Sequence, residues 1–168
     1  MTLNSDDTAD LFTGAWEGRN RFAELIRVAV SRAAEEGWPL LVLSDPDFAD
    51  WPLGEAGVVD ALGRWARQGR QLHFLARDYR MLRERAPRLV QWRVTWDHVV
   101  QARSCRGAMA ERVPSALWSA HWSLERLDVA RCKGVASRDA VRAVELRERL
   151  DACWQQGGAG FPASVLGL

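Results

Sequence analysis

The segment that most narrows the fold is residues 39–52, PLLVLSDPDFADWP. Its first part, 39–44, is an apolar run that is long enough for a buried strand and too short for a helix. The rest contains two prolines and three aspartates, a composition that favours a loop. Residues 71–76, QLHFLA, form a second run of the first kind. The sequence therefore predicts two buried strands, the first of which is followed by an acidic loop.

The segments before and after these two strands have apolar residues at helical spacing. Apolar side chains recur three and four residues apart after Asn20, and Gly37 follows the last of them. A second run of this kind ends before Gly69, and a third, imperfect one follows Ser137, which we expect to cap it. The predicted helices are 20–36, 55–68, 78–85 and 137–156.

Further strands are expected in the second half of the chain. Apolar and polar residues alternate over 90–96, which predicts a third strand, and 116–122 and 124–130 are candidates for a hairpin. Strands alternating with helices imply right-handed crossovers. We therefore predict an α/β fold, with a mostly parallel or mixed sheet of about five strands flanked by helices.

One domain accounts for the whole chain, because 168 residues is an ordinary domain size. Residues 1–18 have no sustained period and are expected to form an N-terminal arm. Residues 19–168 are then the single α/β domain, whose apolar tail, 161–168, docks on its body.

Composition excludes several classes of protein. Hydrophobic residues make up 48% and charged residues 27%, as in an ordinary globular domain. No apolar run approaches the roughly 20 residues of a membrane helix, so no membrane partner is predicted. The three cysteines are widely spaced, with no CxxC pair, and the N-terminus is acidic. These features favour a cytoplasmic protein without disulfides, bound metal or cofactor.

Charge is distributed unevenly along the chain. Residues 1–60 contain 12 acidic and 4 basic side chains, whereas residues 61–168 contain 10 acidic and 19 basic ones. The excess is concentrated over 64–112, with 12 arginines and 4 acidic residues. Such a pattern is typical of a solvated helix face and also suits an anionic ligand. Nucleic acid is an alternative that the sequence does not favour, because no helix-turn-helix or RNA-binding motif accompanies these arginines.

The acidic loop is the best-placed candidate site, because ligands of open α/β sheets bind beyond the carboxyl ends of the strands. It contains Asp45, Asp47 and Trp51. An Asp-x-Asp after an apolar strand resembles the first motif of haloacid-dehalogenase-like phosphatases. That resemblance implies Asp45 as nucleophile and Asp47 as general acid around Mg²⁺. The late acidic pair of that family is absent. A metal-dependent phosphohydrolase is therefore the alternative function.

Arginine, tryptophan and histidine lie close together in WRVTWDH, residues 92–98. On a strand, Trp92 and Trp96 would share one face and Arg93 the other. An arginine near tryptophan can hold a phosphate by charge and by contact with the ring. We include Arg93 and His98 in the candidate site, together with Arg77 after the second strand.

The order LLVLSDPDFADWPL, RQLHFLARDY, VQWRVTW resembles half of a phospholipase-D-like domain over about 100 residues. That family carries a catalytic His-x-Lys motif followed by Asp, and then Gly-Ser-x-Asn. In the corresponding stretch, 114–136, His121 is present, but Ser123 occupies the Lys position and Gly-Ser-x-Asn is absent. The resemblance therefore implies a degenerate, catalytically silent member. It also implies a homodimer, because such half-domains pair.

These observations predict a binding domain rather than an enzyme. Its ligand would be a phosphorylated or otherwise anionic molecule, or a protein partner. The candidate ligand-binding residues are Asp45, Asp47, Trp51, Arg77, Arg93 and His98.

Overall fold

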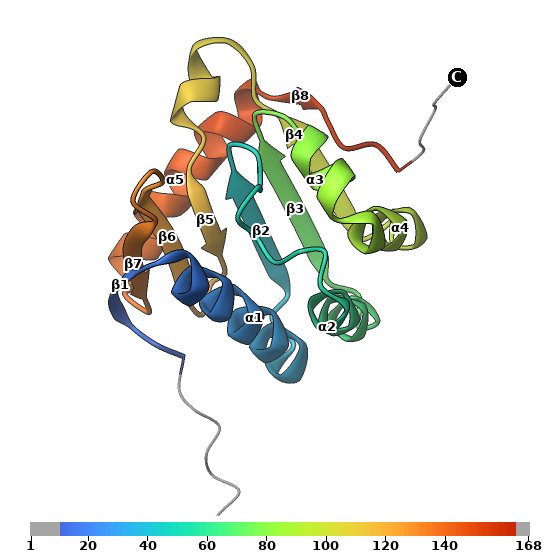
Figure 1. Ribbon diagram of the computed structural model, residues 1–168, viewed down its shortest axis with the longest axis horizontal. Helices are drawn as coiled ribbons and strands as arrows, with labels where there is room; N and C mark the ends of the chain where they lie inside the picture. Colours follow the sequence, from blue (N-terminus) through green and yellow to red (C-terminus); the bar gives the residue numbers. More distant parts are fainter. Residues whose placement is uncertain (1–10, 164–168) are drawn as a thin grey trace, which may run out of the picture.

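The computed structural model describes residues 11–163, which form one eight-stranded sheet with helices on both faces (Figure 1). The strand order is β1-β7-β6-β5-β2-β3-β4-β8. Strands β2, β3 and β4 run parallel, and the other neighbouring strands pair antiparallel. In chain order the elements are β1 (Gly14–Glu17), α1 (Arg19–Glu36), β2 (Leu40–Asp45), α2 (Ala56–Ala66), β3 (Gln71–Ala76), α3 (Arg80–Arg85), α4 (Pro87–Thr95), β4 (Val100–Ser104), the 3-10 helix η1 (Gly107–Arg112), β5 (Ser115–Trp118), β6 (Ser123–Asp128), β7 (Lys133–Ser137), α5 (Ala140–Gln156) and β8 (Gly158–Ala159).

The predicted α/β class and the mixed sheet are confirmed, and the first two predicted strands are β2 and β3. Successive side chains of a strand point to opposite faces of the sheet. Leu41 and Leu43 of β2 accordingly face α1 and α2, whereas Val42 faces α5. Both faces of these central strands are buried, which explains why their sequences are apolar without a break.

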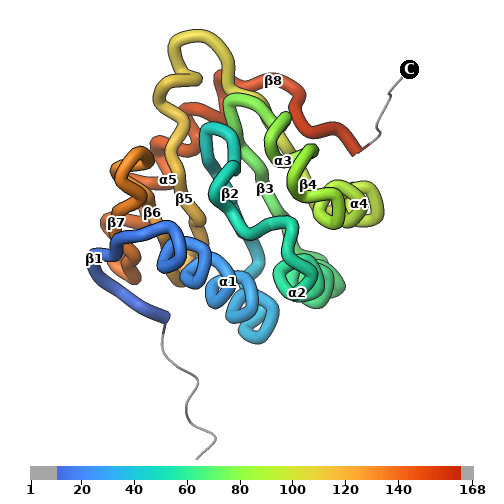
Figure 2. Tube along the Cα trace, viewed as in Figure 1, coloured from blue at the N-terminus to red at the C-terminus, as the bar shows by residue number. Residues whose placement is uncertain are grey.

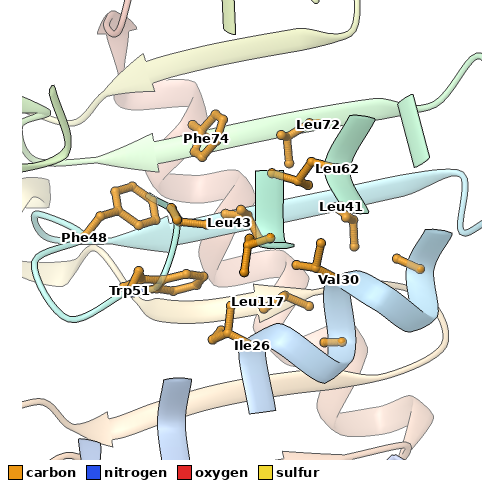
Figure 3. Packing of buried hydrophobic residues seen from close by; sticks show 14 of the residues in the cluster. Ile26, Val30, Leu41, Leu43, Phe48, Trp51, Leu62, Leu72, Phe74 and Leu117 are labelled. Atoms are coloured by element: carbon orange, nitrogen blue, oxygen red, sulfur yellow. The ribbon is translucent and has the colours of Figure 1, made fainter. Parts of the chain in front are cut away.

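The main core lies between the sheet and the α1–α2 layer (Figure 3). Ile26 and Val30 of α1 and Leu62 of α2 meet the sheet there. Helix α1 ends at Gly37, whose φ of 68° is left-handed and suits glycine. Its N–H group donates to the Ala33 carbonyl at 2.9 Å, so the last turn is closed by the backbone.

Helix α5 lies on the opposite face of the sheet (Figure 1). Leu146, Leu150 and Cys153 turn inward and pack against the sheet. The expected cap, Ser137, belongs to β7 instead. Asp139 caps the helix, since its carboxylate accepts the Val141 N–H at 3.1 Å.

The prediction of a third strand over 90–96 is wrong, because most of this segment lies in helix α4. Proline at the first helical position, Pro87, favours helix initiation. Leu89, Trp92 and Arg93 point inward, three and four residues apart, which is the spacing of one helix face. The third parallel strand is β4, which directly follows the helix.

The predicted number of strands, about five, is too low, because the sheet of residues 11–163 has eight. Within the N-terminal arm that we predict over 1–18, residues 14–17 form β1, which pairs with β7. The first ten residues lie outside the described part. Of the predicted C-terminal tail, Phe161 is buried, and residues 164–168 lie outside the described part. Among the described helices, none is long and apolar enough to cross a membrane.

Candidate functional site

The acidic loop starts at the carboxyl end of β2, where Asp45 is fully buried. Its Oδ1 atom accepts hydrogen bonds from Ser115 Oγ at 2.6 Å and from Arg126 Nη2 at 2.9 Å. Its Oδ2 atom accepts from the backbone N–H groups of Asp47 at 3.1 Å and Phe48 at 2.8 Å. These four donors match the acceptor capacity of a carboxylate. The Asp45 carboxylate therefore has no lone pair left for a metal or a substrate.

Arg126 of β6 neutralises this carboxylate inside the protein. The side chains of Arg126 and Asp45 are both 1% exposed. Arg126 also donates to Asp50 Oδ2 at 2.8 Å, and its guanidinium lies 4.6 Å from the ring centre of Phe22. Burial by itself would lower the pKa of Arg126, but the charge of Asp45 and the hydrogen bonds of the guanidinium raise it above its ordinary value. Arg126 stays charged, and the loop is held by a fully paired buried ion pair.

The other two predicted residues of the loop have structural contacts as well. The Asp47 carboxylate accepts the Ala49 N–H at 3.0 Å, which closes a local turn. Trp51 is buried and packs edge-on against Phe22 and Phe48, with ring centres 5.4 and 5.1 Å apart. In the part of the chain that the structure describes, no cluster of three or more His, Cys, Asp and Glu residues could hold a metal ion.

Of the three remaining predicted residues, Arg77 joins the loop. Its N–H group donates to the Pro46 carbonyl at 3.0 Å, and its side chain is exposed. Arg93 is buried on α4, where its Nη1 atom lies 2.8 Å from Asp97 Oδ1. His98 precedes β4, and because β4 is parallel to β2, it lies at the edge of the sheet opposite the loop. The structure therefore brings Arg77 to the loop but not Arg93 or His98.

The stretch that would carry the phospholipase D motif forms no comparable cluster. His121 is exposed in the turn before β6, and its ring stacks on Trp38 with centres 5.6 Å apart. Trp38 precedes β2, so His121 lies at the opposite edge from Asp45. Ser123 is buried at the start of β6. The described residues thus place no basic side chain at the position of the motif's Lys.

Local sequence gives little sign of the two residues that fix the loop. Ser115 and Arg126 lie 70 and 81 residues beyond Asp45, on strands whose position relative to β2 no local pattern specifies. The one signal is Arg126, two residues after Leu124 in a strand whose first four residues are buried, because a buried guanidinium requires a carboxylate partner.

Exposed arginines lie beside the loop, in the segments 77–88 and 106–112. The two segments are adjacent, because the Cys105 N–H donates to the Ala76 carbonyl at 2.8 Å and Arg77 lies 4.0 Å from Glu111. We call these exposed side chains the arginine band: Arg77, Arg80, Arg83, Arg85, Arg88, Arg106 and Arg112.

The arginine band is largely without acidic partners. Apart from Arg77, none of its members forms an ion pair within residues 11–163. Residues 77–112 contain nine arginines against four acidic residues. Arg85 and Arg88 reach only backbone carbonyls, at 3.5 and 3.3 Å. The band is therefore a surface of net positive charge with free guanidinium donors.

Comparison with known proteins gives a fold but no family. No family model matches the chain, and no curated protein matches it. The solved structures similar to it include two with 12% sequence identity each, which supports likeness of fold alone.

The first is TrmBL2, an archaeal chromatin protein with a novel mode of DNA binding, with a TM-score of 0.63 over 93% of this chain. The match spans 56% of the chromatin protein. The second is Nuc, a phospholipase D family member from Salmonella typhimurium, with a TM-score of 0.55 over 88% of this chain and 98% of Nuc. The chain has a fold similar to that of phospholipase D family members.

Proposed function

We propose that this chain is a non-catalytic binding domain, and that the arginine band binds a ligand bearing phosphate groups. The observation that carries the proposal is a set of exposed arginines, all but Arg77 without an acidic partner within residues 11–163. They lie beside a loop whose buried carboxylate is already neutralised. Arginine presents a planar fork of donors that matches phosphate oxygens. Nucleic acid is the ligand class that we favour.

Two observations support a domain without catalytic activity: the contacts of Asp45 and the residues in the stretch of the phospholipase D motif. Asp45 has four hydrogen-bond donors and a buried arginine as counterion, so it is not free to act as a nucleophile or to bind Mg²⁺. Ser123 stands where the phospholipase D motif has a lysine, and His121 is stacked on Trp38.

Nucleic acid is favoured over a small anion by the extent of the arginine band. Its members come from the segment after β3, from α3, from the start of α4, and from η1 and the residue before it. They therefore form a broad surface rather than a single pocket. A polyphosphate backbone can contact many such guanidinium groups at once. Likeness in fold to a chromatin protein with a described mode of DNA binding supports the same class.

Titration of a fluorescently labelled single-stranded oligonucleotide, followed by anisotropy at low and at moderate salt, tests the proposal. We expect saturable binding that weakens steeply with salt, because phosphate contacts release counterions. Absence of binding at both salt concentrations would exclude nucleic acid as the ligand and favour a domain that binds a protein partner.

A metal-dependent phosphohydrolase remains the rival function and has its own assay. Release of phosphate from a generic ester in the presence of Mg²⁺, abolished by Asp45→Asn, would establish the rival. We expect no turnover above that of a blank.

Pairing with a second copy also stays a prediction, because it follows from the resemblance to half-domains. Light scattering of the purified chain tests it directly. We expect twice the chain mass of 18.9 kDa, and the chain mass alone would contradict the prediction.

A further inference from the structure

The end of the described chain inserts an aromatic ring into the protein. After α5, residues 157–163 pass α3 and continue toward α4 (Figure 2). Phe161 is 1% exposed, and its ring stacks on Tyr79 with centres 5.3 Å apart and an interplanar angle of 14°. Phe74 of β3 meets the same ring edge-on at 5.7 Å. Phe161 therefore occupies a slot whose walls are aromatic.

Two arginines complete this slot. The guanidinium carbons of Arg83 and Arg93 lie 5.9 and 6.0 Å from the centre of the Phe161 ring. Arg93 is buried, and its Nε atom donates to the Phe161 carbonyl at 3.2 Å. Arg83 is exposed and belongs to the arginine band. The slot thus opens onto the surface that we assign to phosphate binding.

The segment that carries Phe161 has a strained backbone and little pairing with the sheet. Phe161 has a φ of 43°, in the left-handed region that a phenylalanine rarely adopts. Its pairing with the sheet is limited to β8, a strand of two residues opposite Arg103 and Ser104. Gly160 passes so close to the slot that a Cβ atom would lie 2.8 Å from the Tyr79 ring. Strain and few backbone contacts favour release of the segment as a unit.

We propose that Phe161 is a displaceable plug in a slot for a nucleotide base, formed by Tyr79, Phe74, Arg83 and Arg93. A flat ring between an aromatic face and guanidinium groups is the environment in which single-stranded bases stack. The Tyr79 hydroxyl already donates to the Arg103 carbonyl at 2.6 Å, so Tyr79 offers its face and no polar edge. The slot therefore accepts bases without selecting a sequence. This inference rests on the proposed function and names the ligand as a nucleotide or a single strand.

The first test uses Phe161→Leu, which shortens the plug and keeps an apolar side chain. We expect this variant to bind adenosine 5′-monophosphate and a labelled single strand about tenfold more tightly than the wild type, as one stacked base would allow. Adding Arg83→Gln, an exposed and tolerated change, should cancel the gain. Leu62→Ala, a fully buried position of α2 away from the slot, controls for loss of stability alone.

The second test uses the unaltered protein, in case the variant folds poorly. Amide hydrogen exchange over 157–163 is measured with and without adenosine 5′-monophosphate. Displacement of the plug predicts faster exchange in this segment with the nucleotide present. Unchanged or slower exchange would overturn the inference.

The outcomes separate this inference from the proposed function. Salt-dependent binding of the single strand that is equal in wild type and Phe161→Leu would overturn the slot and leave the arginine band intact. A gain on Phe161→Leu for the mononucleotide, without any effect of the arginine band on oligonucleotide affinity, would support the slot and refute the band.

Discussion

Arg126 is the residue on which the carboxyl-terminal edge of the sheet depends. Its guanidinium links β6 to Asp45 at the end of β2, to Asp50 in the loop and to Ser115 at the start of β5. A buried ion pair of this kind gives little net stability compared with apolar residues, but the loss of one partner leaves an unpaired buried charge. The network is therefore a point at which a single substitution strongly destabilises the fold.

We predict that Arg126→Met lowers the free energy of unfolding by about 3–5 kcal/mol, because the Asp45 carboxylate is left buried without its counterion. Urea denaturation measures the change. Arg131→Met, at an exposed position nearby in the sequence, is the control and should change stability by less than about 0.5 kcal/mol. A loss for Arg126→Met no larger than that of the control would contradict the role assigned to this ion pair.

His73 makes the stability of the protein depend on pH. It lies on β3 beneath α5 and stacks on Trp154 with ring centres 4.8 Å apart. Its buried Nε2 atom has no hydrogen-bond partner among the described residues, 11–163. Burial, and then the positive charges of Arg147 and Arg103, lower its pKa below the ordinary value, against an opposing contribution from Asp151. The unfolded chain therefore binds a proton at this residue at a higher pH than the folded protein does.

We accordingly predict that His73 makes the protein less stable as the pH falls from about 7 to about 5, since protons favour the unfolded state in this window. His73→Phe keeps the stacked ring and removes the titration, so its stability should fall less over the same window. Thermal melts of both proteins across this pH range give the comparison. Parallel curves for the two proteins would show that His73 is not responsible.

Among the helices and strands, the sequence predicts best those whose buried residues recur at one clear spacing. The strands β2 and β3 and the helices α1 and α2 are recovered because each buries a full face or stripe. Strand β4 is missed because VQARS has few apolar positions, and β1 and β8 are missed because they are short edge strands. Such strands are defined by their partners, and pairing over long sequence distances leaves no local pattern.

The segment 90–96 shows how a short window can satisfy two periods. Apolar residues at every second position suggest a strand, yet Leu89, Trp92 and Arg93 form one helix face. The deciding feature is tertiary, because α4 packs on α2. Local alternation could not reveal this contact.

Because Gln91 is exposed inside helix α4, the helix predicts which of two substitutions at this position gives the more stable protein. Alanine favours a helix and valine favours a strand. We expect Gln91→Ala to be more stable than Gln91→Val by about 0.5 kcal/mol, measured by urea denaturation. The opposite order would indicate that this segment is extended.

At the scale of the whole molecule, the acidic and basic parts of the chain neutralise each other only in part. Arg126 brings two N-terminal aspartates into contact with the second half. Other N-terminal acids pair within their own segment, as in Arg27 with Glu55 and Arg21 with Glu24. The arginine band therefore keeps its charge, and the uneven distribution seen in the sequence persists on the folded surface.

The candidate site could be predicted from the sequence in its location but not in its contacts. Asp45 lies where a strand of an open sheet ends, which follows from its position after an apolar run. Its neutralisation by Arg126 depends on the order of β5 and β6 beside β2, which only the fold supplies. The arginine band follows in composition from residues 64–112, but its separation from acidic partners is a property of the folded chain.

Phosphate binding by the arginine band is tested by the salt dependence of oligonucleotide affinity. We would measure the affinity for a labelled single strand against salt concentration for the wild type and for a variant with Arg80, Arg88, Arg106 and Arg112 each changed to Gln. Replacement of Arg64, Arg67, Arg131 and Arg142 by Gln gives a control with the same net charge.

We predict weaker binding by the first variant, and a slope of log affinity against log salt that is shallower by roughly 2–3. The control should keep most of the affinity and the slope of the wild type. Equal slopes and affinities in all three proteins, or binding that does not respond to salt, would contradict the claim.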